Sequence, residues 1–141
     1  MNLKQKQKQN SNLNSLLKGF VISVSAGKLP ATKRRSKCQR FIESIVSNNI
    51  QLNSNELAHL WKGIYYAIWY SEMGKGCEEI IQTVVHHANR QILVAGFDSM
   101  TREWFVTDSF RLDKLAFLAR VCLNKTIQMQ IDDALNQSMK Y

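Results

Sequence analysis

Apolar residues recur at helical spacing along most of the chain, and the pattern is clearest in residues 57–71, the aromatic segment. The residues that repeat there every three or four positions are Leu57, Leu60, Trp61, Ile64 and Ile68. This spacing predicts a helix, and tyrosines and tryptophans carry apolar surface most of the way round it. Because a helix that is apolar on nearly every side is normally buried between other helices, we expect the aromatic segment to form the centre of the fold, with most of its rings in the core.

The same periodicity predicts helices on both sides of the aromatic segment. Their expected ranges are 12–25, 30–47, 77–87, 91–105, 109–124 and 126–139. Asn53 followed by Glu56 matches a capping box that opens the central helix, and Asp108 is the expected N-cap of 109–124. Pro30 suits a first helical turn, and residues 73–76 form the expected turn after the central helix. We therefore predict an all-α fold in which antiparallel helix pairs stack as a HEAT/armadillo-like helical repeat.

The first ten residues differ from the rest of the chain, because they are rich in lysine, glutamine and asparagine. Such low-complexity polar segments bury too little apolar surface to fold alone. We predict a disordered basic lead-in at residues 1–10, followed by a single all-α domain at residues 11–141, a length that suits one domain.

The net charge of +8 is concentrated near the N-terminus. Residues 1–40 hold ten lysines and arginines and no acidic residue, whereas the remaining 101 residues hold nine basic and eleven acidic residues. This asymmetry predicts an anionic partner, nucleic acid before others; an ordinary solvated tail is the alternative. The expected phosphate contacts are Lys33, Arg34, Arg35, Lys37 and Arg40. The same run resembles a nuclear localisation signal.

The sequence contains no recognisable catalytic, metal-binding or cofactor-binding motif. Cys38, Cys77 and Cys122 are scattered, with no Cys-x-x-Cys pair, which is typical of a reduced intracellular compartment. No nucleophile–base pair or metal cluster is visible, and no apolar run is long enough to span a bilayer. We therefore expect a protein that is not an enzyme, with no cofactor, no small-molecule substrate and no membrane association.

Two residues of the aromatic segment stand out from its apolar pattern. Gly63 lies mid-helix, where glycine costs about 1 kcal/mol relative to alanine, so we expect a neighbouring backbone to approach it closely. Lys62 needs either solvent or a carboxylate as a partner. Our hypothesis is that Lys62 pairs with Asp113 or Asp108 and so ties the central helix to a later corner of the chain.

Two segments carry a resemblance to a known family. They are residues 60–71 and residues 100–114, the corner segment. In composition, order and separation these segments resemble the signature segments of the eukaryotic Rrp1/Nop52 family of ribosomal RNA processing proteins, and the resemblance covers roughly residues 16–123. Val106 and Thr107 replace the glycine and isoleucine usual in that family. The residues that the resemblance marks as structural or interface positions are Trp61, Lys62, Gly63, Trp69, Arg102, Glu103, Trp104, Asp108, Arg111, Asp113 and Lys114.

The resemblance implies a function that composition alone does not. It implies a non-enzymatic assembly factor of the nucleus and nucleolus, acting in ribosomal RNA processing and in assembly of the large (60S) subunit precursor. The implied partners are the large-subunit pre-ribosomal particle, meaning its assembly-factor proteins and its precursor RNA. Family members also continue through further helices into a long basic tail. Two alternatives remain, a generic helical-repeat adaptor and a free-standing basic RNA-binding module.

Overall fold

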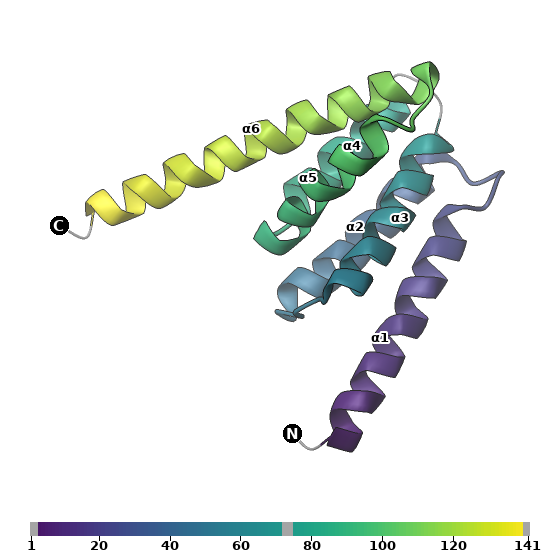
Figure 1. The fold of residues 1–141 in the computed structure, drawn as a ribbon, viewed down its shortest axis with the longest axis horizontal. Helices are drawn as coiled ribbons and strands as arrows, with labels where there is room; N and C mark the ends of the chain where they lie inside the picture. The colour runs from purple at the N-terminus through teal and green to yellow at the C-terminus, as the bar shows by residue number, and fades with distance from the viewer. Residues whose placement is uncertain (1–2, 72–74, 140–141) are drawn as a thin grey trace.

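The computed structural model describes residues 3–71 and 75–139 and folds them into helices without strands (Figure 1). The helices are α1 (Leu3–Val24), α2 (Ala31–Ser47), α3 (Ser54–Trp69), α4 (Lys75–His87), α5 (Arg90–Trp104) and α6 (Ser109–Met139). The predicted all-α class is therefore confirmed for the described part of the chain. The finer class of helical repeat stays a prediction.

The helices lie in two rows with α3 near the middle. In one row α4 packs between α2 and α6, and in the other α3 packs between α1 and α5. The helix α3 contacts every other helix of the described chain, which explains why it is apolar almost all round. Leu60, Ile64 and Ile68 are completely buried and Trp61 is 1% exposed, so the predicted central helix and its buried core are confirmed.

Capping residues define where the helices begin. The Asn53 side chain accepts a hydrogen bond from the Glu56 backbone N–H, and the Glu56 carboxylate accepts one from the Asn53 N–H, each at 2.8 Å. This is the predicted capping box. Asp108 Oδ1 accepts from the Arg111 N–H at 2.9 Å, which confirms Asp108 as the N-cap of α6. Asn89 caps α5 in the same way, although the sequence analysis did not identify it.

Two helices are longer than the sequence pattern predicts. The first begins at Leu3 rather than near residue 12, so residues 3–10 are helical where we expected a disordered lead-in. The reason is that lysine and glutamine are good helix formers and that no glycine or proline interrupts this stretch. The two expected helices 109–124 and 126–139 form the single helix α6. Asn124 alone does not end it, because neither glycine nor proline occurs in residues 109–139.

Other boundaries agree within a few residues. Pro30 immediately precedes α2 as its N-cap, one position before the expected first turn. Lys75 and Gly76, expected in a turn, begin α4 instead. Met73 and Gly74 of the same expected turn lie outside the described residues.

Candidate functional site

The two family-like segments meet at the C-terminal end of α3. Lys114, 8% exposed on α6, directs its Nζ atom to the last two carbonyl groups of α3 and to that of Ser71, two residues beyond the helix. It donates to Ile68 O at 2.9 Å, Trp69 O at 3.3 Å and Ser71 O at 2.6 Å. Carbonyls at a helix C-terminus lack partners within the helix and form the negative end of its dipole. A lysine at this position therefore links the aromatic segment to the corner segment.

Arg34 of α2 also reaches this end of α3, where it donates to the Tyr70 carbonyl. It is 2% exposed, and its guanidinium donates to Val24 O at 3.1 Å, Tyr70 O at 3.0 Å and Ala26 O. The guanidinium also lies 5.7 Å from the centre of the Tyr70 ring. Because all of these donors are used inside the protein, Arg34 is not available to bind a phosphate, and its expected place on the RNA-facing surface is wrong.

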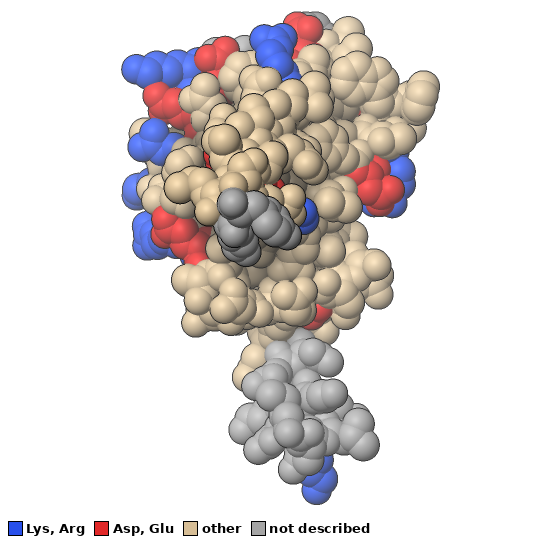
Figure 2. Space-filling model, turned by 90° about the vertical axis from the view of Figure 1, so that its left-hand side faces the viewer, with Lys and Arg blue, Asp and Glu red and all other residues tan. Residues whose placement is uncertain are grey.

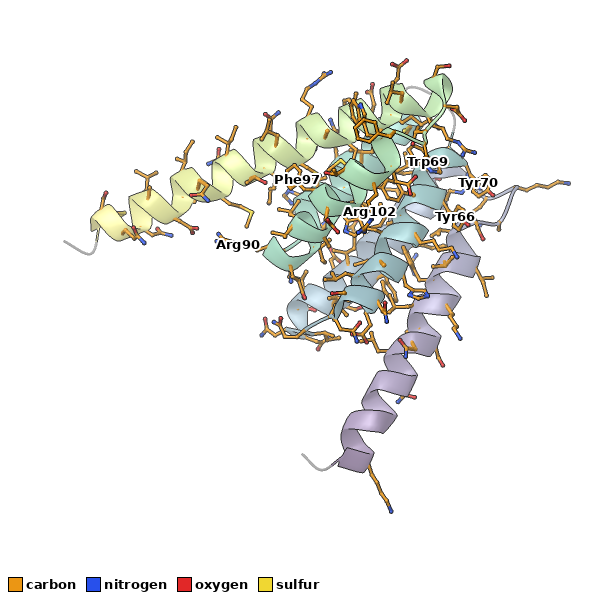
Figure 3. All side chains as sticks on the ribbon, in the orientation of Figure 1. Tyr66, Trp69, Tyr70, Arg90, Phe97 and Arg102 are labelled. Carbon is orange, nitrogen blue, oxygen red and sulfur yellow. The ribbon has the colours of Figure 1, made fainter. Side chains whose placement is uncertain are left out.

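We call this arrangement the α3 junction: the C-terminal end of α3 with the buried cations Arg34 and Lys114. Figure 3 shows Tyr66, Trp69 and Tyr70 on this end of α3. No acidic side chain forms an ion pair with either cation among the described residues. Burial lowers the pKa of Lys114, the nearby Cys77 thiol acts in the opposite direction and Arg111 adds to the lowering. Among the residues that the structure describes, backbone carbonyl groups are therefore the acceptors that stabilise the two buried charges.

The hypothesis that Lys62 pairs with Asp113 or Asp108 is wrong. Lys62 is exposed on α3 and forms no ion pair within the described part of the chain. Asp108 lies instead near Arg111, whose Nε is 3.8 Å away, and Asp113 is exposed. The contact that the hypothesis required is made by Lys114, because that residue lies on the buried face of α6 while Asp113 points outward.

Trp61 packs α3 against α5, and Gly63 allows α3 to pack against α1. The Trp61 ring donates from Nε1 to Ile92 O at 2.9 Å and lies against Gly96 of α5, where any side-chain carbon would overlap the ring. A methyl group at Gly63 would lie 2.5 Å from Phe20 Cε1. The expected close approach at Gly63 is thus real, but an aromatic ring of α1 makes it rather than a backbone.

Met100 of the corner segment belongs to the core, whereas its charged residues other than Lys114 lie near the surface. Arg102 pairs with Asp98 at 2.8 Å, one turn away on α5. Trp104 is 41% exposed, and the Glu103 carbonyl accepts from Thr107 Oγ1. The Arg111 guanidinium lies 5.8 Å from the centre of the half-buried Trp69 ring. The corner segment therefore combines one buried cation, Lys114, with an exposed rim.

Four of the five predicted phosphate-binding residues remain accessible, but they do not share one face. Lys33, Lys37 and Arg40 follow i, i+4, i+7 spacing and so lie on one side of α2, which we call the basic face. Lys37 and Arg40 border a shallow groove of about 410 Å³ between α1 and α2. Arg35 lies on another side of α2, where it pairs with Glu79 of α4 at 3.0 Å. The basic face therefore contains three of the predicted residues.

A larger groove, which the sequence analysis did not predict, runs between α3 and α5. It measures about 1100 Å³, and Arg90 and Arg102 lie at the two ends of α5 that border it (Figure 3). Trp61, Val94 and Asp98 contribute to its walls. Two residues of the family-like segments, Trp61 and Arg102, thus help to form this groove.

One sequence signal could have revealed the junction cations. Arg34 shares a helical face with Cys38, Ile42 and Ile45, all buried. Lys114 likewise precedes Leu115, Leu118 and Cys122 on the inner side of α6. A basic residue in register with an apolar stripe is a candidate for burial, whereas membership of a charged run is not a reliable sign of exposure.

Neither a metal site nor a membrane span is found in residues 3–71 and 75–139. No group of three histidine, cysteine or acidic side chains is close enough to hold a metal ion there. None of the helices in this part combines the length and the apolarity needed to cross a bilayer.

Comparison with known proteins identifies the family. The family model described as "Nucleolar protein, Nop52" matches residues 28–140, which span α2 to α6. The mouse protein "Ribosomal RNA processing protein 1 homolog A" is 34% identical over 82 residues, which are 52% of this chain and 17% of the mouse protein. The human protein of the same name is 34% identical over 83 residues, covering 53% of this chain and 18% of that protein. Human "Ribosomal RNA processing protein 1 homolog B" is 31% identical over 85 residues, 55% of this chain and 11% of its own length.

The matched region is a small part of each relative, since it spans less than a fifth of the lengths of these curated proteins. No solved structure matches the chain. The family model nevertheless covers most of the sequence, including both segments that meet at the α3 junction. The chain therefore belongs to the Nop52 family of nucleolar proteins.

Proposed function

We propose that this chain is a non-enzymatic factor in ribosomal RNA processing and in assembly of the large (60S) ribosomal subunit precursor in the nucleolus. The observation that carries the proposal is the family match over residues 28–140, joined with relatives named as ribosomal RNA processing proteins. The two-row packing of α1–α6 supports a HEAT/armadillo-like scaffold, a fold class suited to extended binding surfaces.

In this proposal the chain contacts precursor RNA through the basic face, Lys33, Lys37 and Arg40. Lysine and arginine side chains on one helix face can contact backbone phosphates of RNA, and such contacts do not depend on the base sequence. Protein partners of the precursor particle are the second kind of contact. The alternative function, a free-standing RNA-binding module, has the same basic face in its favour but gives the α3 junction and its family-like segments no part in function.

Co-sedimentation on a sucrose gradient tests the proposed function. The tagged chain is expected to migrate with large-subunit precursors, identified by the RNA in the peak fraction. Substituting Lys33, Lys37 and Arg40 together by glutamine should weaken this association, because three phosphate contacts are lost. The matched control replaces Lys18, Lys75 and Arg120, three exposed cations outside the basic face, and so loses the same charge.

Two further conditions separate the possible causes of a change. A heterologous nuclear import signal on every variant removes any effect of the basic run on import. An intact chain that stays at the top of the gradient, with this import signal present, would contradict the assembly-factor function. Equal losses in the triple variant and in its control would contradict the basic face as the RNA contact. Tight binding of purified chain to bare RNA, without particle association, would favour the RNA-binding module.

A further inference from the structure

The groove between α1 and α2 combines apolar walls with two cations of the basic face. It measures about 410 Å³, and Leu16 of α1 and Phe41 of α2 both line it. Lys37 and Arg40 lie on its α2 side. The half-buried Phe41 ring stacks on Phe20, with the ring centres 4.6 Å apart, and is thereby held in place. An apolar surface beside cations suits a ligand that has both a flat apolar part and a negative charge.

None of the described residues that line this groove is acidic. The sequence of α1 contains no aspartate or glutamate, and that of α2 contains one, Glu43. The Glu43 carboxylate accepts a hydrogen bond from Gln39 Nε2 and lies 3.4 Å from His87 Nδ1, so it is directed toward α4. The three residues of the basic face form no ion pair within the described part of the chain. An anion in the groove therefore meets positive charge that is not already neutralised.

Two other parts of the surface suit an anion less well. Arg90 and Arg102, which border the larger α3–α5 groove, already pair with Asp133 and Asp98. Figure 2 shows the side of the molecule toward which α6 runs: its centre is largely uncharged, and red residues lie next to blue ones at the left and right margins. The residues coloured in that view therefore form no continuous basic surface.

Gly19 lines the α1–α2 groove at a position where packing inside the protein does not require glycine. Glycine destabilises the interior of a helix relative to alanine. A side-chain carbon at Gly19 would meet no heavy atom within 4 Å, whereas one at Gly63 would lie 2.5 Å from the Phe20 ring. The absence of a side chain at Gly19 therefore leaves open space in the groove rather than room for a neighbouring helix.

We propose that the α1–α2 groove binds a single-stranded segment of RNA, a choice of ligand that rests on the proposed function. The phosphates lie on the basic face, and one unpaired base lies in the groove against Leu16 and Phe41. Single strands suit such a groove because their bases are free to stack on aromatic side chains while their phosphates follow the cations. In a duplex the bases are paired and stacked inside, so a duplex can use the cations but not the apolar walls.

Fluorescence anisotropy of the purified 141-residue chain tests the groove. The probes are a labelled RNA single strand of about twelve nucleotides, within the usual site size of single-strand binding folds, and a labelled RNA duplex of the same length. The single strand should bind at least about fivefold more tightly, through the base contact. A purely electrostatic surface would instead favour the duplex, which has the higher charge density. Equal binding of the two probes, or tighter binding of the duplex, overturns the proposal.

A pair of uncharged variants locates the base contact. Leu16→Ala removes an apolar side chain from the groove and should weaken single-strand binding at least about threefold. It should leave the dependence of affinity on salt unchanged, because no phosphate contact is lost. Ile22→Ala removes an apolar side chain from α1 outside the groove lining and should have little effect. Leu16 and Ile22 are 60% and 71% exposed, so both variants should retain the melting temperature of the parent. Equal effects of the two variants, or none of Leu16→Ala, would contradict the base contact.

Two substitutions at Gly19 test whether its open space holds RNA. Gly19→Leu fills part of the groove and should weaken single-strand binding at least about fivefold, while duplex binding stays unchanged. Gly19→Ala, the smaller control, should have much less effect. Both replacements favour a helix more than glycine does, so α1 should be preserved. Single-strand binding by Gly19→Leu that equals or exceeds that of the parent overturns the proposal.

An acidic protein segment is the other ligand that a cationic groove could take. Polyglutamate of about the length of the RNA that binds as tightly as the single strand, with the same loss in Leu16→Ala, would rule out RNA as the specific ligand. Failure of the proposed function gives a different result, because the sucrose gradient reports on the precursor particle rather than on bare RNA. A chain that migrates with the precursors but prefers duplex RNA contradicts only the groove, and a chain that prefers single strands but stays at the top contradicts only the assembly function.

Discussion

The basic residues at the start of α2 divide between the interior and the surface of the molecule. Arg34 is 2% exposed and donates hydrogen bonds to three carbonyl groups at the α3 junction. Lys33 and Arg40, on the same helix, are exposed on the basic face. Residue type and local sequence are similar in both cases, so rotation about the helix axis separates a structural cation from a candidate RNA contact.

The contrast shows what a buried cation requires. Arg34 and Lys114 lie where several backbone carbonyls at the ends of α1 and α3 converge, and a cation there adds donors to acceptors at a helix end, where intrahelical donors run out. No such convergence of carbonyls around the basic face is found in the described part of the chain, and its Lys33 and Arg40 side chains are exposed. Substitutions at the junction should therefore change stability, whereas those on the basic face should change binding.

The largest expected effect is that of Arg34→Met. The variant removes the Arg34 donor from the Val24 and Tyr70 carbonyls, whereas the Ala26 carbonyl keeps its hydrogen bond from the Leu29 N–H. An unsatisfied buried acceptor costs about 1–3 kcal/mol. We expect a loss of about 3 kcal/mol in the free energy of unfolding, measured by urea denaturation. Arg40→Met, the matched change on the basic face, should stay within about 0.5 kcal/mol. Similar losses in the two variants would remove the distinction between the two sites.

Cysteine reactivity should report the same division between the inner and outer sides of α2. Cys38 and Cys122 are completely buried and Cys77 is 3% exposed, and burial raises the pKa of Cys38 and of Cys122 to about 12. Because the thiolate is the reactive form, the native chain at pH 8 should react with a thiol reagent at least about 100-fold more slowly than the urea-unfolded chain. Arg40→Cys should add one rapidly reacting thiol; slow reaction at that position would mean that the basic face is not accessible.

The smallest expected effect is that of Lys114→Met, at about 2 kcal/mol near neutral pH, because desolvation of the ammonium offsets part of its attraction to the carbonyls. Burial lowers the folded-state pKa of Lys114 below 10.5. Between that lowered pKa and 10.5 the unfolded chain binds more protons than the folded chain, so the contribution of Lys114 to stability rises with pH.

The measurement compares urea denaturation of the parent and of Lys114→Met from neutral pH to about pH 10.5, the ordinary lysine value. Titration of the other groups is common to both chains and cancels in the difference. The difference in the free energy of unfolding should widen as the pH rises. A difference that narrows would contradict the lowered pKa of Lys114.

Helix positions were largely predictable because they depend on local patterns. The capping box at Asn53 and the N-cap at Asp108 were visible in a few neighbouring residues. The boundaries that differed, at Leu3 and within α6, were those where no capping residue, glycine or proline limits the helix. The site was less predictable: Arg34 was assigned to the surface and Lys62 to an ion pair, and Gly96 and the α3–α5 groove were not identified.

By itself, the sequence determined the all-α class, the central position of the aromatic helix and the family, because periodicity and the two segments are local properties. Only the tertiary structure decided which cations are buried. Arg34 meets Tyr70 from 36 residues away, and Lys114 meets Ile68 from 46 residues away. Which carbonyls stand opposite a given side chain depends on how whole helices rotate and pack against one another, and local periodicity does not specify that rotation.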